Sequence, residues 1–390
     1  MNASATQVFN FLPVPTDVHF GPGISQSLPE RVRALGARRV LVVTDPGVRA
    51  AGLADRVTAR LRDESIDFEI YDQVTADSGS TLIVNGVTAL KASGADAVVG
   101  VGGGSALDTA KAVAALATNP GSPLDYVGLH KVTRPPLPVI AIPTTAGTGS
   151  EVSLWSVFTD DDSGLKVAIG GVHLYPAVAL CDPDLTMDLP PALTASTGMD
   201  ALAHAIECYT NNACQPISGA LALEAIRLIG RHLAAAALNG RSREARYGMM
   251  LASTMAGMAM NPTRLGLAHA YAMPLGSWDL KIPHSIAIAV TLPLVMEFNC
   301  LAAPGRFADV ARALGEPVEG CSLADAAARA PAAVARLASS IGVPKGLSQF
   351  GLREHHLQRV VDDAMKSGNV AVNPRRAGRD EMMSLLRRAL

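Results

Sequence analysis

The stretch VVGVGGGSALDTAKA, residues 98–112, runs from a short apolar strand through three glycines into a helix. Glycine lets the backbone approach a ligand closely, and the N-terminus of the following helix offers unpaired N–H groups to a phosphate. The dinucleotide fingerprint GxGxxG is not met, because Leu107 stands at its third glycine, and the P-loop spacing before Lys111 is also absent. On this stretch alone, a tight turn without a ligand is an equally good interpretation.

The sequence on either side alternates in the same way. Short apolar runs predict buried strands, and the stretches between several of them predict helices. The predicted strands are 38–45, 67–72, 95–101, 138–143 and 177–182, and the predicted helices are 48–63, 81–93 and 105–117. This order predicts a doubly wound parallel sheet, buried on both faces, which binds ligands at the carboxyl ends of its strands.

After about residue 185 the pattern changes to an Ala/Leu/Met-rich helical periodicity. The predicted helices are 192–209, 217–238, 242–260, 284–300 and 323–341, with loops at 211–216 and 260–266. We therefore predict an α/β, Rossmann-like dinucleotide-binding domain over residues 1–185 and an all-helical domain over residues 186–390.

The composition excludes several classes of protein. Of the 390 residues, 49% are hydrophobic and 17% are charged, which is typical of a large buried core. The formal net charge is −2 without a basic block, so neither nucleic acid nor a membrane surface is an expected partner. Five scattered cysteines, no readable signal peptide in residues 1–15 and no apolar run long enough to span a bilayer indicate a cytoplasmic protein.

A second loop, PTTAGTGSE at residues 143–151, also follows a predicted strand and is rich in hydroxyl groups. Two such loops at neighbouring strand ends predict a cradle for a pyrophosphate and a nicotinamide, although a hydroxyl-rich turn that caps a helix is the alternative. The predicted cofactor-binding residues of the two loops, together with Lys166, are Gly102, Gly103, Gly104, Ser105, Asp108, Thr144, Thr145 and Thr148.

Asp45 ends the strand at 38–45 and is followed by Pro46. A carboxylate at this place accepts hydrogen bonds from ribose hydroxyls and repels a 2′-phosphate, which favours NAD over NADP. An Asp–Pro pair is also a good helix cap, and one side chain can serve both purposes.

The segment GMDALAHAIE, residues 198–207, places Asp200 and His204 one helical turn apart on the same face. This spacing suits two ligands of one metal ion, and it also suits an ordinary buried carboxylate–imidazole hydrogen bond. His269 and His284 follow later in the chain. One carboxylate and three imidazoles suit a divalent metal such as Fe²⁺, Zn²⁺, Ni²⁺ or Mn²⁺ with a position left open for substrate.

These motifs make nearly the whole chain resemble the iron-containing (group III) alcohol dehydrogenases, a family that includes lactaldehyde reductases and 1,3-propanediol dehydrogenases. The resemblance rests on GGGSALDTAK (102–111), PTTAGTGSE (143–151), DPDL (182–185), GMDALAHAIE (198–207), GLAHAYAMPLG (266–276) and PHSIAIAVTLP (283–293).

The resemblance implies a dehydroquinate synthase-like fold, a homodimer and a small alcohol or aldehyde substrate. It also implies that hydride passes to or from NAD while a divalent metal, most often Fe²⁺, activates the substrate oxygen. The implied metal ligands, which form the catalytic set, are Asp200, His204, His269 and His284.

The sequence departs from the family at several places. Met273 replaces a second histidine that many members carry, and methionine cannot relay protons. The bulky SWDLK (277–281) fills the loop beside the implied site, and ADSGS (76–80) replaces an NPT-like turn. A hydroxyacid–oxoacid transhydrogenase is therefore one alternative, and a non-catalytic nucleotide- or metal-binding relative is another.

Two cationic side chains precede implied ligands. Arg264 lies five residues before His269, and Lys281 lies three residues before His284. A guanidinium can hold a carboxylate, phosphonate or sulfonate, so these positions predict an anionic or strongly polar substrate tail. In the alternative interpretation both side chains face solvent or pair with nearby acids.

Overall fold

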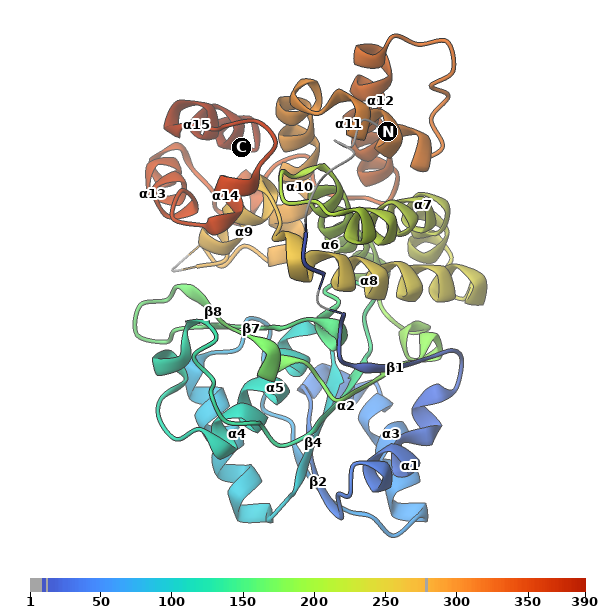
Figure 1. Cartoon of the computed structure of the whole chain (residues 1–390), viewed down its shortest axis with the longest axis vertical. Helices are drawn as coiled ribbons and strands as arrows, with labels where there is room; N and C mark the ends of the chain where they lie inside the picture. The colour runs from blue at the N-terminus through green and yellow to red at the C-terminus, as the bar shows by residue number, and fades with distance from the viewer. Residues whose placement is uncertain (1–8, 12, 278–279) are drawn as a thin grey trace. The chain divides into compact units, whose positions relative to one another are not determined.

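The computed structural model describes residues 9–11, 13–277 and 280–390. The described chain divides into two compact units, an α/β unit over Val14–Leu189 and a helical unit over Pro190–Leu390 that also includes the described residues before Val14 (Figure 1). Most of residues 1–15, the segment without a readable signal peptide, lies outside the described residues, as do Trp278 and Asp279 of the SWDLK loop.

Within the described residues, the α/β unit contains a six-stranded sheet whose pairings are all parallel. Its strand order is β1 (Asp17–Phe20), β9 (Val178–Cys181), β6 (Val139–Pro143), β4 (Ala97–Gly102), β2 (Arg39–Val43) and β3 (Asp67–Tyr71). The doubly wound parallel sheet predicted from the alternating pattern is confirmed. The central strands β4 and β6 are adjacent, and Gly102 is in register with Pro143.

Helices cover both faces of this sheet, as Figure 1 shows. On one face Leu41 and Val98 pack against α4 (Ser80–Ser93) and α5 (Gly104–Thr118). On the other face Val40 and Val99 pack against α1 (Leu28–Ala34) and α3 (Leu53–Asp63). Neighbouring residues of a strand point to opposite faces, so runs of valine and isoleucine supply both cores.

Two of the predicted elements of the α/β unit differ in the structure. The helix predicted at 48–63 is divided into α2 (Pro46–Ala50) and α3, because Gly52 takes a left-handed conformation with φ 73°. Strand β3 is not buried on both faces, since it forms the edge of the sheet and exposes every second residue.

A small second sheet in the α/β unit was not predicted. It orders β5 (Gly128–Leu129), β8 (Lys166–Gly170) and β7 (Trp155–Thr159), with β8 antiparallel to β7. Short 3₁₀ turns also occur in both units, at η1 (Ile24–Ser27), η2 (Pro123–Tyr126), η3 (Ser150–Val152), η4 (Val172–Leu174), η5 (Pro183–Thr186), η6 (Cys300–Ala302) and η7 (Ser348–Phe350).

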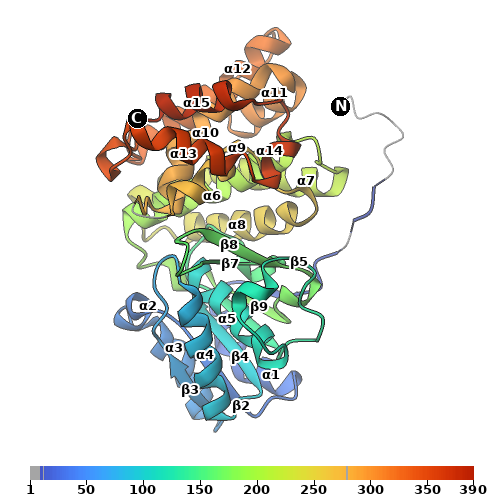
Figure 2. The ribbon, with the colours of Figure 1, turned by 90° about the vertical axis from the view of Figure 1, so that its left-hand side faces the viewer.

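The helical unit begins with α6 (Pro191–Thr210), which is buried along most of its length and packs against α7, α8 and α10. Figure 2 shows this unit from a second direction. Its other helices are α7 (Pro216–Leu238), α8 (Arg243–Thr263), α9 (Leu267–Leu275), α10 (His284–Asn299), α11 (Pro304–Ala313), α12 (Leu323–Ser340), α13 (Glu354–Ala364), α14 (Gly368–Val372) and α15 (Arg379–Arg388). The loop predicted at 260–266 begins later than expected, because α8 continues through Pro262 to Thr263.

One segment of the described chain, His284–Ala302, is long and apolar enough to cross a membrane, with a mean hydropathy of 1.7. The expectation that no run of this kind exists was therefore wrong on length and composition. More than half of the segment, 56%, is buried inside the structure, as is typical of a core helix in a soluble protein.

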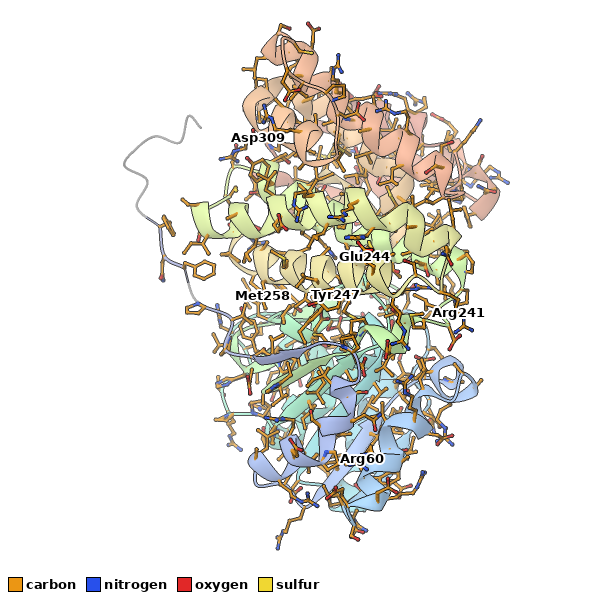
Figure 3. All side chains as sticks on the ribbon, turned by 90° about the vertical axis from the view of Figure 1, so that its right-hand side faces the viewer. Arg60, Arg241, Glu244, Tyr247, Met258 and Asp309 are labelled. Atoms are coloured by element: carbon orange, nitrogen blue, oxygen red, sulfur yellow. The ribbon has the colours of Figure 1, made fainter. Side chains whose placement is uncertain are left out.

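Exposed side chains of opposite charge form pairs on both units, and Figure 3 labels Arg60 and Glu244, each of which belongs to one such pair. Arg60 of α3 lies 3.3 Å from Asp63, and Glu244 of α8 lies 3.4 Å from Arg231 of α7. Pairs this exposed stabilise a fold by roughly 0–1 kcal/mol each, so they matter more for solubility than for stability.

A buried ion pair, in contrast, fastens α5 to the segment that follows β6. The Lys111 side chain is almost fully buried, and its ammonium lies 3.0 Å from Asp108 and donates to the Ser150 carbonyl at 3.1 Å. Asp108 in turn accepts hydrogen bonds from the Ser150 hydroxyl and from the Val157 N–H. Burial lowers the pKa of Lys111, and Asp108 opposes that shift.

We predict that Lys111→Met destabilises the α/β unit by about 3–5 kcal/mol, because it leaves the Asp108 carboxylate, which is only 13% exposed, without its cation. Urea unfolding followed by circular dichroism measures the shift. Lys91→Met, at an exposed lysine of α4, is the matched control and should change stability by about 0.5 kcal/mol or less. An unchanged unfolding midpoint for Lys111→Met would show that the pair does not fasten these segments.

Candidate functional site

Helix α6 presents three chemically active side chains on one face. Asp200, His204 and Glu207 are spaced by four and three residues, which places them along one stripe of the helix. All three are buried, with exposed fractions of 5% or less. Alanines at positions between them keep the helix narrow, so neighbouring helices can approach this face closely.

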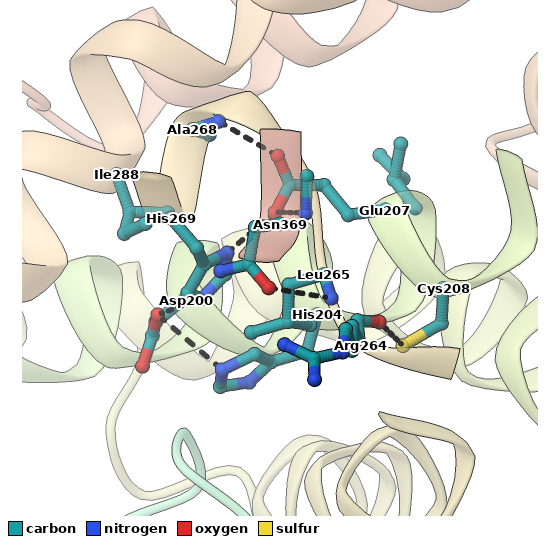
Figure 4. Close-up of polar contacts among 12 residues, drawn as sticks. Asp200, His204, Glu207, Cys208, Arg264, Leu265, Ala268, His269, Ile288 and Asn369 are labelled. Carbon is teal, nitrogen blue, oxygen red and sulfur yellow. Dashed lines mark hydrogen bonds and ion pairs between the residues drawn. The ribbon is translucent and has the colours of Figure 1, made fainter. Parts of the chain in front are cut away.

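The side chains that the sequence assigned to a metal come together from α6, α9 and the start of α10. Asp200 Oδ1 lies 3.9 Å from His204 Nε2 and 3.5 Å from His269 Nε2 (Figure 4). The His204 and His269 rings are stacked with centroids 4.6 Å apart, and the His284 ring lies 5.7 Å from that of His269. One potential ligand atom from each of Asp200, His269 and His284 lies within 4.8 Å of the others.

The charges within this cluster support one another. Burial alone would raise the pKa of Asp200, but His204, His269 and His284 outweigh it and hold that pKa well below its usual value. Burial alone would lower the pKa of His269, but Glu207 and Asp200 outweigh it and raise that pKa to about 9. The cluster is therefore built around an ionised carboxylate.

The donor atoms of this cluster fit a divalent cation. Among the residues that the structure describes, Asp200 Oδ1 and His269 Nε2 are buried polar atoms without a hydrogen-bond partner. Leaving such atoms unsatisfied costs about 1–3 kcal/mol each, whereas a cation held between them would satisfy both. One carboxylate oxygen with imidazole nitrogens is a donor set that suits iron, zinc and similar metals.

Glu207 is a residue of this site that the sequence reasoning did not single out. Its carboxylate lies 2.6 Å from His269 Nδ1 and accepts hydrogen bonds from the N–H groups of Gly266 and Ala268 (Figure 4). In the sequence, only its place three residues after His204 on the same helical face indicated that Glu207 belongs to the site. Its hydrogen-bond partners lie about sixty residues further along the chain, so the sequence could not identify them.

The two loops assigned to a cofactor lie side by side in the α/β unit, at the carboxyl ends of β4 and β6. A Cβ atom at Gly104 would lie 2.7 Å from the Thr148 methyl carbon, and one at Gly103 would lie 3.4 Å from that of Thr145. Glycine at 104 is therefore required for the loops to approach each other. Thr144 connects the two loops where they begin, since its N–H donates a hydrogen bond to the Gly102 carbonyl at 3.0 Å.

Asp45 lies at the end of the adjacent strand β2. Its Oδ1 accepts a hydrogen bond from the Val48 N–H at 2.9 Å and so caps α2, as the Asp–Pro pair predicts. Its Oδ2 would lie 3.3 Å from a Cβ atom at Gly102. The cap therefore uses one carboxylate oxygen, and the other faces the glycine loop.

The remaining assigned residues fall into two groups. Ser105 and Lys166 meet at Asp77, whose N–H donates to the Ser105 hydroxyl at 3.3 Å and whose carboxylate pairs with Lys166 at 2.5 Å. Asp108 lies apart from this group, in the buried pair with Lys111 that holds the second loop in place.

Two further residues of the helical unit were singled out in the sequence, Met273 and Arg264. Met273 is half-buried on α9, one turn after His269. Arg264, between α8 and α9, is exposed and adopts φ 60° and ψ −168°, a region that is essentially reserved for glycine. Its carbonyl accepts hydrogen bonds from Asn211 and Thr263, and its guanidinium passes Gly368, where any Cβ would collide with it.

Comparison with known proteins gives matches along both units. Residues 15–183 match the family model described as iron-containing alcohol dehydrogenase. Residues 194–390 match the model for the C-terminal part of the Fe-containing alcohol dehydrogenase family.

Individual relatives agree with these matches. The chain is 39% identical to a 1,3-propanediol dehydrogenase of Klebsiella pneumoniae, covering 98% of this chain and 99% of that protein. A crystal structure of a 1,3-propanediol oxidoreductase matches with a TM-score of 0.95 and 38% identity, covering 98% of this chain and 100% of that one. The sulfoacetaldehyde reductase of Bifidobacterium kashiwanohense, solved in complex with NAD⁺, matches with a TM-score of 0.87 and 30% identity, covering 98% and 99% of the two chains. The chain belongs to the iron-containing alcohol dehydrogenase family and is an oxidoreductase that acts on CH–OH groups.

Proposed function

We propose that the protein is an NAD-dependent, metal-containing alcohol dehydrogenase or aldehyde reductase, which transfers hydride between the nicotinamide and a small alcohol or aldehyde. The observation that carries this proposal is the convergence of Asp200 with three histidines in the family's helical unit. The metal, for which Fe²⁺ is the first candidate, supplies a Lewis acid for the substrate oxygen when it is bound.

Cofactor binding and metal binding are assigned to different parts of the sequence. We assign cofactor binding to residues 1–185, through Asp45 and the loops that start at Gly102 and Thr144, and metal binding to residues 186–390. The close approach of the two loops supports the first assignment. The buried donor atoms Asp200 Oδ1 and His269 Nε2 support the second.

We further propose that the enzyme is cytoplasmic and a homodimer. The five cysteines are thiols and not disulfides, and Cys181, Cys208, Cys214 and Cys300 are buried, which fits a reducing compartment. The homodimer rests on the family resemblance. Size-exclusion chromatography with light scattering tests it directly.

Met273 bears on proton transfer, and it is the reason why a hydroxyacid–oxoacid transhydrogenase is a second candidate activity. A thioether has no titratable proton, so Met273 cannot relay one. The ribose of a bound cofactor and water would have to carry the proton of the substrate hydroxyl instead. A hydroxyacid–oxoacid transhydrogenase would work with a cofactor that it retains. Turnover by extensively dialysed protein without added NAD would identify this second activity.

For the substrate we propose an anionic or strongly polar tail, held by Arg264. Two observations support this choice: the Arg264 backbone is held in a strained conformation by several hydrogen bonds, and Gly368 leaves room for its guanidinium. A family member named for sulfoacetaldehyde offers a precedent for a sulfonate tail. Lys281 is exposed and also has a positive φ of 44°, so we assign it a weaker, supporting role.

The metal site is tested by His269→Ala and Asp200→Ala. We expect either change to abolish most of the activity and to lower the metal content, while NAD binding persists because the dinucleotide loops belong to the other unit. Metal analysis, steady-state kinetics and NAD titration measure the three effects. His355→Ala, at an exposed histidine of α13, is the matched control. Full activity in a metal-depleted variant would contradict the Lewis-acid mechanism.

Cofactor choice is tested at Asp45. We expect NAD(H) to be preferred over NADP(H), because the carboxylate would repel a 2′-phosphate, and we expect Asp45→Gly to narrow that preference. Asp45→Asn separates the two roles, since asparagine keeps the helix cap but removes the charge. Ratios of kcat/KM for the two cofactors measure the effect. If the wild-type enzyme favours NADPH, capping α2 is the whole role of Asp45.

Substrate choice is tested at Arg264. We expect Arg264→Ala to raise KM for sulfoacetaldehyde by about 10- to 100-fold, the range for losing a charge-assisted contact worth about 1.5–3 kcal/mol. The KM for propanal, which has no charge, should barely change. Arg231→Ala, at another exposed arginine of the helical unit, should affect neither substrate. Equal effects of Arg264→Ala on both aldehydes, or none on either, would mean that Arg264 faces solvent only.

A further inference from the structure

The buried carboxylate of Glu207, in the helical unit, contacts hydrogen-bond donors that all come from the start of α9. Glu207 is 4% exposed, and its Oε1 accepts from the Ala268 N–H at 2.7 Å. Its Oε2 accepts from the Gly266 N–H at 2.9 Å and lies 2.6 Å from His269 Nδ1. Figure 4 shows the carboxylate reaching from α6 to this segment. A buried carboxylate is costly unless it is paired, and these contacts compensate it.

The chain keeps a space open for this contact at Gly266. A Cβ atom there would lie 2.7 Å from Glu207 Oε1, closer than real Cβ atoms approach. The φ of Gly266 is −143°, an extended conformation that any residue adopts, so the close approach of the carboxylate is what requires glycine here. The segment is therefore shaped to receive Glu207.

The contact determines which nitrogen of His269 faces the cluster. Two backbone N–H groups already donate to the carboxylate, so it acts as an acceptor and His269 Nδ1 is the third donor. A histidine binds a metal only as the neutral ring, so a bound cation would displace the second proton that His269 carries without metal. With the remaining proton on Nδ1, the lone pair of the neutral ring would lie on Nε2. This nitrogen lies 3.5 Å from Asp200 Oδ1.

We propose that Glu207 is a positioning residue for the metal site, which sets the ring orientation and tautomer of His269 and fixes the start of α9 against α6. This inference rests on the proposed metal site. Because Asp200 and His204 stand on the same helix as Glu207, one carboxylate fixes His269 relative to both of them. A group that only capped α9 would have no need of the bond to the imidazole ring.

The experiment compares metal binding by the full-length wild-type protein and Glu207→Gln, each stripped of metal and titrated with Zn²⁺ in the presence of a competing chelator. A carboxamide has the same shape but replaces one acceptor oxygen by an NH₂ donor. We expect affinity to fall by about 10- to 100-fold, the usual effect of losing a partner of a metal-bound histidine. The visible spectrum of the Co²⁺ protein should change as well, which a purely structural role would not cause.

Two further variants separate the possible causes. Gly266→Ala keeps the charge of Glu207 but displaces its carboxylate, and it should also weaken metal binding. Asp182→Asn alters another fully buried carboxylate, which accepts from Gly23 and Ser25 in the α/β unit, and it should leave metal affinity unchanged.

The outcomes are distinct. Weaker Zn²⁺ binding by folded Glu207→Gln and Gly266→Ala, with unchanged binding by Asp182→Asn, is the expected result. Wild-type affinity in a folded Glu207→Gln overturns the positioning role, as does loss of helical content in both metal-free variants. If the wild-type protein itself binds no metal, the proposed function fails first, and the two failures are thereby told apart.

Discussion

The helical unit depends on how it compensates the buried charge of Asp200. A carboxylate removed from water needs cations or hydrogen bonds around it, and here the imidazoles of His204, His269 and His284 supply that environment. Because those rings come from α6, α9 and α10, satisfying one charge brings three helices together. Glu207 extends the same principle, since its own charge is compensated by the backbone at the start of α9. The electrostatic requirements of two acids thus determine where the helices meet.

The α/β unit gathers its polar groups by geometry rather than by charge. In a parallel sheet the carboxyl ends of adjacent strands lie at one edge, so Asp45, Gly102 and Thr144 become neighbours although about a hundred residues separate the first from the last. The Lys111–Asp108 pair then holds the second loop against α5. Backbone topology places the loops, and one buried ion pair keeps them there.

Much of this could be predicted from the sequence. The long helices and the apolar strands of the main sheet have strong periodicities, and the resemblance to a known family named the residues that cluster around Asp200. Features that depend on distant partners could not be predicted. In the sequence Glu207 resembles any other helical glutamate, and only the fold brings the Gly266 segment to it. Likewise, Asp108 and Lys111 have the i,i+3 spacing of an exposed pair, and only the fold places β7 over them. The second sheet was missed because β5 has only two residues, and because β7 and β8 are only partly buried, unlike the central strands of the main sheet.

Helix α10 has a consequence for how the chain is made. It is apolar on nearly every side, as its burial requires, and it packs against α6 and α9, which precede it, and against α12 and α15, which follow it. During synthesis from the N-terminus, α10 therefore leaves the ribosome before half of its covering helices exist. A segment this apolar is prone to aggregate until the later helices cover it, and chaperones recognise such surfaces. The helix that begins with His284 is therefore also a part of the nascent chain that needs protection until α12 and α15 have been made.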